Sequence, residues 1–257
     1  MRQSRERKYV MIYITGDTHG RFEKLMWKTK LAEGDTVIIC GDFGGVWDGS
    51  EYERRLLNRL AQLPYTILFV DGNHENFDRL YSFPVEEWSG GRIHRIKPNV
   101  IHLMRGQVFV IEGKRFFAFG GASSHDISDG ILEPDDPDFE RKEAQLWWMN
   151  ALYRVNHVSW WKEELPSDEE MEEGIRNLEK AGNSVDVTLT HCAPTSVQDI
   201  FGESFYERDR LTDYLEKIKN TVDFKKWFFG HYHNDYVVDD KFVMMYRDVT
   251  GLDRFVK

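Results

Sequence analysis

The chain has 257 residues, of which 41% are hydrophobic and 30% charged, and its formal net charge at pH 7 is −10. This acidic balance argues against a general binder of nucleic acids or anionic membranes, because such a binder needs a basic surface. The 17 Phe, 11 Tyr and 8 Trp supply enough apolar material for a packed core, so disorder is not the default interpretation. The length fits one large α/β domain or two small domains.

No run approaches the roughly 18 consecutive apolar residues that a membrane-spanning helix needs. Residues 1–17 are basic but lack the apolar region and the small-residue cleavage site of a secretory signal. We therefore expect a cytoplasmic protein without a membrane partner. Residues 1–10, which precede a second methionine at Met11, are expected to be a basic extension with no catalytic role. Cys40 and Cys192 are expected to be small buried side chains at strand ends.

The first part of the chain predicts a parallel sheet. Three short apolar runs end in glycine followed by an acid or amide, and two segments with helical spacing separate them. The expected strands are 9–14, 36–39 and 66–70, and the expected helices are 21–32 and 51–63. Alternating strands and helices at this spacing imply right-handed parallel crossovers. Ligands bind such sheets at the loops after the carboxyl ends of the strands, where the polar motifs of this chain fall.

The pattern changes after residue 100. Residues 100–121 contain three short apolar runs separated by Arg-Gly and Glu-Gly, which predict antiparallel hairpins in a mixed sheet or at the start of a second sheet. Residues 135–182 are charged and helical in pattern, and we interpret them as a helical insert. The insert contains four tryptophans, which favour packing of helices onto the sheet over a substrate cap. They are Trp147, Trp148, Trp160 and Trp161.

The last part of the chain returns to strands. They are expected at 185–190, 227–229, 236–238 and 242–246, with a helix near 209–219. No internal repeat, low-complexity tract or Pro-, Gly- or Ser-rich linker divides the sequence. We therefore predict a single domain over residues 11–257, with the helical insert at about 135–182.

Five polar motifs follow the expected strands. They are Gly16-Asp17-Thr18-His19, Gly41-Asp42, Gly72-Asn73-His74-Glu75, Thr190-His191 and Gly230-His231-Tyr232-His233. Carboxylate, imidazole and amide oxygen are ligands suited to borderline or hard divalent ions such as Mn, Fe, Zn or Co. Because the motifs contain no cysteine, an iron–sulfur centre and a Cys-rich structural zinc site are excluded.

The motifs supply too many candidate ligands for one ordinary ion. The seven are Asp17, His19, Asp42, Asn73, His191, His231 and His233. If Asp42 bridges two ions, the seven residues divide into two sets of four. Two metals roughly 3.5 to 4 Å apart are the usual arrangement for phosphoester hydrolysis, in which they clamp the anionic substrate and generate a hydroxide nucleophile. Such a centre is locally electropositive although the chain as a whole is acidic.

The five motifs in this order resemble the calcineurin-like metallophosphoesterase superfamily over positions 16 to 233. The resemblance implies an α/β (α+β) fold, in which two mixed β-sheets pack as a sandwich flanked by helices, with a dinuclear centre at the strand ends. It implies two sets of ligands: Asp17, His19, bridging Asp42 and His233 for one ion, and Asp42, Asn73, His191 and His231 for the other. Manganese is the favoured ion, and Fe, Zn, Co and Ni are also compatible. His74 corresponds to the family's catalytic histidine.

The chain departs from the Ser/Thr protein phosphatases of that superfamily. The acid three residues after Gly41-Asp42, and the Arg that follows it, are both missing. Asp48 and Glu75 stay open as candidates for the acid that orients His74. Arg79 and His125 are candidate substrate contacts. Arg79 could clamp a phosphate oxygen, although a surface charge is favoured, and His125 lies in a substrate-entrance loop or an ordinary polar turn.

We expect metal-dependent hydrolysis of a small soluble phosphoester, with a phosphomonoesterase favoured. The alternatives are a phosphodiesterase acting on nucleotides or cyclic nucleotides and, in another class, a non-catalytic metal-binding scaffold for protein interactions. A long nucleic acid is not expected, because the sequence has no basic tract beyond its first eight residues. The oligomeric state is left open.

Overall fold

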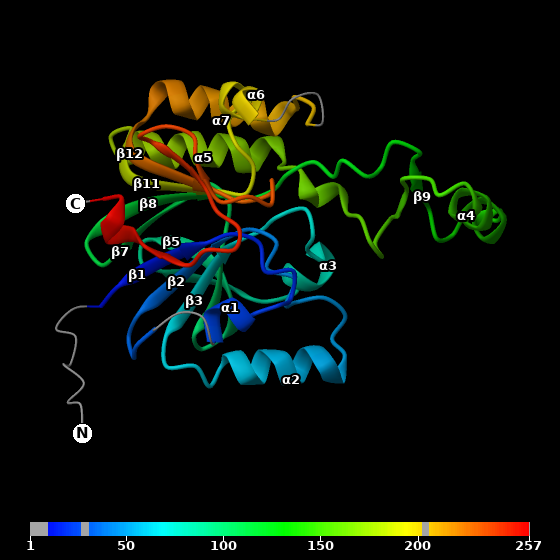
Figure 1. The fold of residues 1–257 in the computed structure, drawn as a ribbon, viewed down its shortest axis with the longest axis horizontal. Helices are drawn as coiled ribbons and strands as arrows, with labels where there is room; N and C mark the ends of the chain where they lie inside the picture. The colour runs from blue at the N-terminus through cyan, green and yellow to red at the C-terminus, as the bar shows by residue number, and fades with distance from the viewer. Residues whose placement is uncertain (1–9, 27–30, 202–205, 257) are drawn as a thin grey trace.

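The computed structural model describes residues 10–26, 31–201 and 206–256, so the predicted basic extension lies, apart from Val10, outside the described residues. Two β-sheets pack face to face, with helices on both outer faces (Figure 1). This arrangement confirms the predicted sandwich of two mixed sheets flanked by helices. None of the helices in the described ranges combines the length and the apolar character needed to cross a bilayer.

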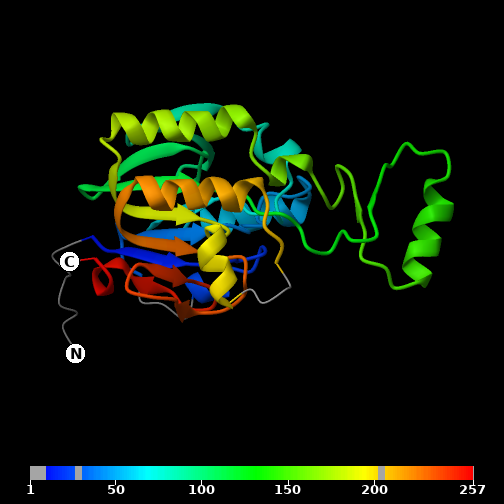
Figure 2. The same cartoon turned by 90° about the horizontal axis from the view of Figure 1, so that it is seen from above.

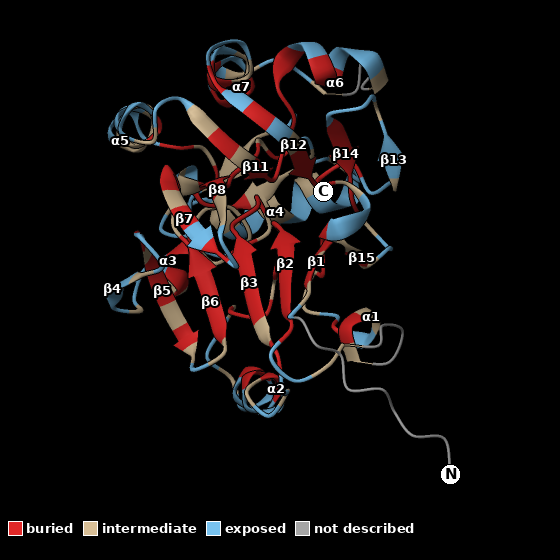
Figure 3. Cartoon of the chain, turned by 90° about the vertical axis from the view of Figure 1, so that its left-hand side faces the viewer, coloured by how far each residue is buried: buried red, intermediate tan, exposed pale blue. Residues whose placement is uncertain are grey.

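The first sheet contains seven strands. In chain order they are β1 (Ile12–Thr15), β2 (Thr36–Cys40), β3 (Thr66–Val70), β4 (Val85–Trp88), β5 (Gly91–Lys97), β6 (Val100–Leu103) and β15 (Thr250–Gly251). Their spatial order is β15-β1-β2-β3-β6-β5-β4. The strands β1, β2 and β3 are parallel, as the crossover spacing predicts, and β6 is parallel to β3, which the hairpin pattern of residues 100–121 does not predict. Both β2 and β6 are buried along their whole length (Figure 3), as expected for strands covered on two faces.

The second sheet contains six strands. They are β7 (Gln107–Ile111), β8 (Lys114–Phe119), β11 (Ser184–Thr190), β12 (Asp223–Phe229), β13 (Tyr236–Val237) and β14 (Phe242–Met244). Their spatial order is β13-β14-β12-β11-β8-β7, with β8, β11, β12 and β14 parallel. The segment 100–121 is therefore divided: β6 lies inside the first sheet between β3 and β5, and the β7–β8 hairpin begins the second sheet. The antiparallel pair β4 and β5 is not anticipated by the sequence analysis.

Helices cover the outer faces of both sheets (Figures 1 and 2). They are α1 (Glu23–Met26), α2 (Glu51–Leu60) and α3 (Phe77–Leu80) on the side of the first sheet, and α5 (Asp168–Lys180), α6 (Thr195–Phe201) and α7 (Arg210–Thr221) on the side of the second. The local sequence explains α2. The side chain of Ser50 caps its N-terminus by accepting from Glu53 N, and Leu56, Leu57 and Leu60 bury one face. Of the helix predicted over 21–32, residues 23–26 form α1, residues 21–22 and 31–32 are not helical, and residues 27–30 lie outside the described residues.

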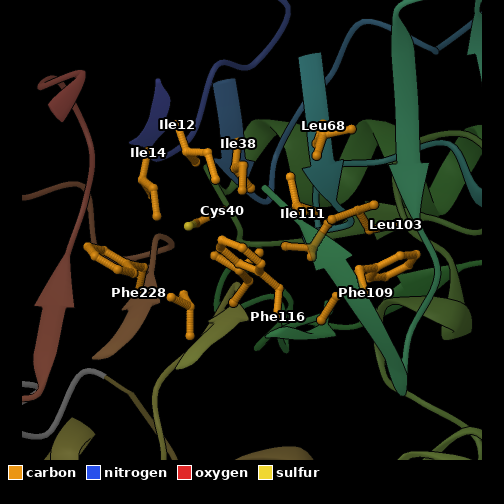
Figure 4. Packing of buried hydrophobic residues seen from close by; sticks show 14 of the residues in the cluster. Ile12, Ile14, Ile38, Cys40, Leu68, Leu103, Phe109, Ile111, Phe116 and Phe228 are labelled. Atoms are coloured by element: carbon orange, nitrogen blue, oxygen red, sulfur yellow. The ribbon is translucent and has the colours of Figure 1, made fainter. Parts of the chain in front are cut away.

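The main core lies between the sheets. Ile14, Cys40 and Leu68 from the first sheet face Phe116 and Phe228 from the second (Figure 4), and all five are buried. Burial of such apolar side chains is the dominant favourable term in folding. Cys40 and Cys192 are buried free thiols, as predicted.

Residues 126–160, here called the arm, project away from the two sheets (Figures 1 and 2). The arm contains the two-stranded pair β9 (Ile131–Leu132) and β10 (Arg154–Val155) and the helix α4 (Phe139–Trp148). The prediction that Trp147 and Trp148 pack onto the sheet is wrong, because these side chains are 75% and 83% exposed. The reason is that α4 reaches no sheet surface and buries none of its residues.

The other tryptophans of the predicted insert lie closer to the body. Trp161 is 1% exposed and packs edge-on against Trp47, and Trp160 is of intermediate burial. The helix predicted after Pro166 is α5, which begins with a capping box formed by Ser167 and Glu170 and packs on the second sheet. The segment 135–182 therefore combines an exposed arm with one helix of the sandwich.

Candidate metal centre

All five motif loops meet at one edge of the sandwich. Parallel strands in both sheets end at this edge, so residues far apart in the sequence become neighbours. Asp17 and His19 follow β1, Asp42 follows β2, Asn73 and His74 follow β3, His191 follows β11, and His231 and His233 follow β12. The structure thus brings together all seven candidate ligands and His74.

The first group consists of Asp17, His19, Asp42 and His233, whose ligand atoms all lie within 4.8 Å of one another. His19 Nε2 is 3.0 Å from His233 Nε2 and 3.6 Å from Asp42 Oδ2. His233 Nε2 is 3.1 Å from Asp17 Oδ2. Two imidazole nitrogens and two carboxylate oxygens therefore converge on one point, which is a donor set suited to a divalent ion.

One atom of this group favours a bound cation directly. Asp17 Oδ2 is buried and receives no hydrogen bond. A buried carboxylate oxygen without a partner is unfavourable, because it has lost its hydration and gained no replacement. A divalent ion among these four residues would supply the missing partner, so the residues fit a metal ion.

The second group shares Asp42 with the first. His191 Nε2 lies 3.3 Å from Asp42 Oδ1 and 3.3 Å from Asn73 Oδ1. The ring of His231 is 5.1 Å from the ring of His191, centroid to centroid. His191 Nδ1 donates to Cys40 O at 2.8 Å, which fixes the ring with Nε2 toward the group. Because the two oxygens of Asp42 face different groups, this carboxylate is placed to bridge.

Four of the seven candidate ligands have a left-handed backbone. The φ angles of His19, Asp42, His231 and His233 are 45°, 50°, 67° and 52°. Residues other than glycine adopt this region rarely, at about 1–3 kcal/mol each in strained cases. Such strain gathered at one edge of the sheets indicates selection for the position of these side chains rather than for stability.

The glycines of the motifs make room for the ligands. A Cβ on Gly72 would lie 2.1 Å from Asp42 Oδ1, and a Cβ on Gly230 would lie 2.2 Å from Asp17 Oδ1. Both distances are far below van der Waals contact, so a side chain at either position would displace a carboxylate of the centre.

Burial lowers the pKa of the candidate ligands His19 and His231 below the ordinary value and favours the neutral imidazole that metal ligation requires. Burial also lowers the pKa of His74. The carboxylate of Asp17, whose Oδ2 lies 3.1 Å from His233 Nε2, raises the pKa of His233. Burial opposes protonation of His191, but the carboxylates of Asp42 and Asp17 outweigh it and raise the pKa of His191 to about 10. An ion in the second group would take the place of that proton.

His74 lies beside the two groups. Its backbone N donates to Asp42 Oδ1 at 2.8 Å, and its half-buried ring is 5.2 Å from the ring of His19. Glu75 and Asp48 are the two candidates for the acid that orients His74. Glu75 accepts from the backbone N of Phe43 at 2.7 Å and so holds the loop after β2. Asp48 accepts from Ser50 N. Among the hydrogen bonds of the described residues, neither acid contacts the ring of His74.

The two candidate substrate contacts differ in their surroundings. Arg79 donates through Nε to Glu53 Oε1 at 2.7 Å, and Glu53 also accepts from the backbone N of Trp47 and Gly49. Arg79 thus supports a loop. The ring of His125 lies 6.0 Å from that of His231 and lines a cavity of about 360 Å³ beside the second group.

A second cavity, of about 500 Å³, borders the first group and is lined in part by residues that the sequence analysis does not single out. Its lining includes Asp17, His19, Arg21, Lys24, Tyr246 and Arg247. Lys24 Nζ donates to Gly16 O at 2.7 Å and to Asp17 O at 3.0 Å, and the ring of Tyr246 stacks on His233 at 4.7 Å. No motif marks Arg21, Lys24, Tyr246 and Arg247, because they come from two distant parts of the chain.

Comparison with known proteins agrees with this geometry. The model of the calcineurin-like phosphoesterase family matches residues 10–235. The chain is 22% identical over 259 residues to the human lariat debranching enzyme, covering 86% of this chain and 42% of that protein. It is 20% identical over 274 residues to the lariat debranching enzyme of Schizosaccharomyces pombe, covering 93% and 53%. The chain therefore spans only about half the length of these curated relatives. Because the family match extends over most of its residues, the chain belongs to the calcineurin-like phosphoesterase family.

Proposed function

We propose that this chain is a phosphodiesterase with a dinuclear metal centre. One ion would be held by Asp17, His19, Asp42 and His233, and the other by Asp42, Asn73, His191 and His231. The proposal is supported by the two groups of donor atoms that share Asp42, and by the unpartnered Asp17 Oδ2 in the first group. Two ions that share a bridging carboxylate would suit phosphoester hydrolysis. Their identity stays a prediction, with manganese favoured.

The observation that carries the choice of a diester is the pair of cavities. One borders the second group at His231, and the other borders the first group at Asp17 and His19. A phosphodiester has two organic substituents on phosphorus and a monoester has one, so a centre with a cavity beside each metal group suits the diester. The curated relatives are lariat debranching enzymes, which are phosphodiesterases. Both observations favour the alternative of the sequence analysis over the monoesterase it preferred.

The lining of the cavities points to an RNA phosphodiester as substrate. Arg21, Lys24 and Arg247 place positive charge beside the first group, where a neighbouring phosphate would lie. Tyr246 and, in the other cavity, Tyr206 offer aromatic rings on which bases can stack. Because the chain as a whole is acidic, we propose a short or single-stranded segment rather than a long duplex.

Each residue has a distinct role in this scheme. The bound ions would polarise the phosphoryl oxygens and supply the nucleophile. His74, at the edge of both groups, would contact the leaving oxygen and, in its protonated form, give it a proton. The carbonyl of Cys40 holds the ring of His191, and Lys24 holds the loop that carries Asp17.

The test is a comparison of esters on protein loaded with Mn, Fe or Zn. We expect kcat/KM for bis-p-nitrophenyl phosphate to exceed that for p-nitrophenyl phosphate at least tenfold, and a panel of linear and branched RNA oligonucleotides to be cleaved. Asp42→Asn should abolish turnover, whereas Asp48→Asn, at an acid outside both groups, should not. A preference for the monoester would contradict the proposal. Metal-loaded protein inert to every ester would favour the scaffold alternative.

A further inference from the structure

The two segments that flank the arm meet next to Asn73, where Ser124 contacts both Asn73 and Glu164. Ser124 lies two residues before the arm, and Glu164 lies after it in the 3₁₀ helix η1 (Lys162–Glu164). Asn73 Nδ2 donates to Ser124 Oγ at 3.3 Å, and Ser124 Oγ donates to Glu164 Oε2 at 2.6 Å. Ser124 N also donates to Glu164 Oε1 at 2.9 Å. All three residues are buried.

We propose that Ser124 and Glu164 are positioning residues that set the orientation of the Asn73 amide, so that its oxygen rather than its nitrogen faces the second metal. This inference rests on the dinuclear centre proposed above. It adds two residues that contact neither ion.

The argument follows from the number of protons available. A serine hydroxyl has one proton, and here Glu164 Oε2 accepts it. Ser124 Oγ is then left with lone pairs only, so it must accept from the NH₂ of Asn73. The amide oxygen consequently points the other way, to within 3.3 Å of His191 Nε2. A flipped amide would set an oxygen against Ser124 Oγ and present an NH₂, which cannot ligate a cation, to the second group.

The burial of Glu164 is hard to explain by stability alone. Its carboxylate is 3% exposed, and no Lys or Arg side chain in the described residues forms an ion pair with it. Burial raises the pKa of Glu164, and the donors from Ser124 oppose that shift. Taking a carboxylate out of water is unfavourable unless it is well paired. A role in orienting the metal ligand Asn73 would explain why the Glu164 carboxylate is buried at this position.

A second connection holds η1 in place. Arg105 Nη2 donates to Glu163 O at 2.8 Å, and Arg105 Nε donates to Asp71 Oδ2 at 2.8 Å. Asp71 is two residues before Asn73. Arg105 therefore connects the loop after β3, which carries Asn73, to η1, which carries Glu164. This connection and the hydrogen bonds of Ser124 together fix the positions of Asn73 and Glu164 relative to each other.

The decisive variant is Glu164→Gln, which keeps the shape of the side chain but replaces one acceptor oxygen with a donor NH₂ group. The new NH₂ would donate to Ser124 Oγ and free the serine proton for Asn73, which favours the flipped amide. We expect calorimetric titration with Mn²⁺ to show at least a tenfold loss of affinity at one site and less than a twofold change at the other. The exchange-coupled Mn pair in the electron paramagnetic resonance spectrum of the unaltered protein should give way to a mononuclear signal.

Two further variants keep the test independent of folding. Ser124→Ala removes the hydroxyl and should weaken the same Mn²⁺ site, whereas Ser124→Thr retains a hydroxyl and should restore most of the affinity. Glu163→Gln is the matched control, because it makes the same chemical change one residue away, where the carboxylate lies 3.9 Å from Lys162 instead of contacting Ser124. It should leave both Mn²⁺ affinities unchanged.

The outcomes separate this inference from the proposed function. Two unaltered Mn²⁺ affinities in both Glu164→Gln and Ser124→Ala would overturn the positioning role and leave the dinuclear centre standing. Equal weakening of both sites would also overturn it, since that is the signature of a general structural role. If the unaltered protein binds a single Mn²⁺ ion, the dinuclear centre itself is wrong and the positioning role fails with it.

Discussion

The body of the molecule and the arm use the same kinds of side chain in opposite ways. In the body, Trp227 is fully buried and donates through Nε1 to Thr190 Oγ1 at 2.8 Å. In the arm, Trp147 and Trp148 lie on a helix that buries none of its residues. An aromatic-rich sequence therefore indicates a core only where the topology brings a second apolar surface against it.

The two regions also differ in how their charges are held. In the body, Asp71 and Arg105 form a buried pair, and His102 Nε2 lies 3.0 Å from Asp71 Oδ1. At the base of the arm, Arg154 pairs with Asp126, and both side chains are partly exposed. A pair shielded from water is strongly coupled, whereas an exposed pair is screened by solvent. We therefore expect substitutions in the body to have large effects and those in the arm to have small ones.

The largest expected effect is on the buried pair. Arg105→Met should lower the free energy of unfolding by about 3–5 kcal/mol, because it leaves the carboxylate of Asp71 buried without its cation. The matched change in the arm, Arg154→Met, should lower it by less than about 1 kcal/mol. Urea denaturation of the two variants measures both values. Equal effects would mean that the arm is as tightly coupled to the fold as the body.

The next effect concerns catalysis by a histidine of the body. His74→Ala should lower kcat/KM on an RNA oligonucleotide by about 100-fold or more, the usual contribution of a general acid when an alkoxide leaves, while metal content stays the same. His157→Ala serves as the comparison in the arm, where the exposed imidazole contacts Asp78. It should change kcat/KM less than twofold. Parental activity in His74→Ala would remove the proposed role.

A smaller effect is expected at the rim of the centre. Arg247 is exposed and lines the cavity beside the first group. Arg247→Ala should raise KM for an RNA oligonucleotide about fivefold, which corresponds to about 1 kcal/mol, and reduce the slope of affinity against salt by about 1. Arg176→Ala, at an exposed arginine of α5 that pairs with Glu172, is the control. An equal change in KM in both variants would indicate unspecific attraction rather than a subsite.

The smallest effect is expected at the far end of the arm. Trp148→Ala should change the free energy of unfolding by no more than about 0.5 kcal/mol, because the side chain is already in water. Trp227→Ala, in the second sheet, should cost about 3–5 kcal/mol. Urea denaturation distinguishes the two. A large loss in Trp148→Ala would show that the arm packs against something in solution, and the contrast between the two regions would no longer hold.

Much of the centre could be predicted because its signals are local. Each ligand sits within four residues of a strand end, and all but His191 lie next to a glycine or two residues from a second ligand, as in Asp17 with His19 and His231 with His233. Alternating strands and helices place the ends of β1, β2 and β3 at one edge, so the ligands meet without any knowledge of side-chain contacts. The fold class follows from the same alternation and from the motif resemblance.

The rest depended on how distant segments pack. The sequence by itself determined the alternation of strands and helices and the candidate ligands, since these follow from periodicity and from residue types at strand ends. The expectation of a sandwich and of a catalytic His74 came from the motif resemblance. Only the tertiary structure decided that α4 stands away from the sheets, that Arg21 and Arg247 share a cavity, and that Ser124 and Glu164 lie behind Asn73. These relations join loops 40 to more than 200 residues apart. Sequence periodicity does not predict these contacts between distant loops. They arise because the two sheets stack, and the placement of one sheet on the other depends on the whole chain.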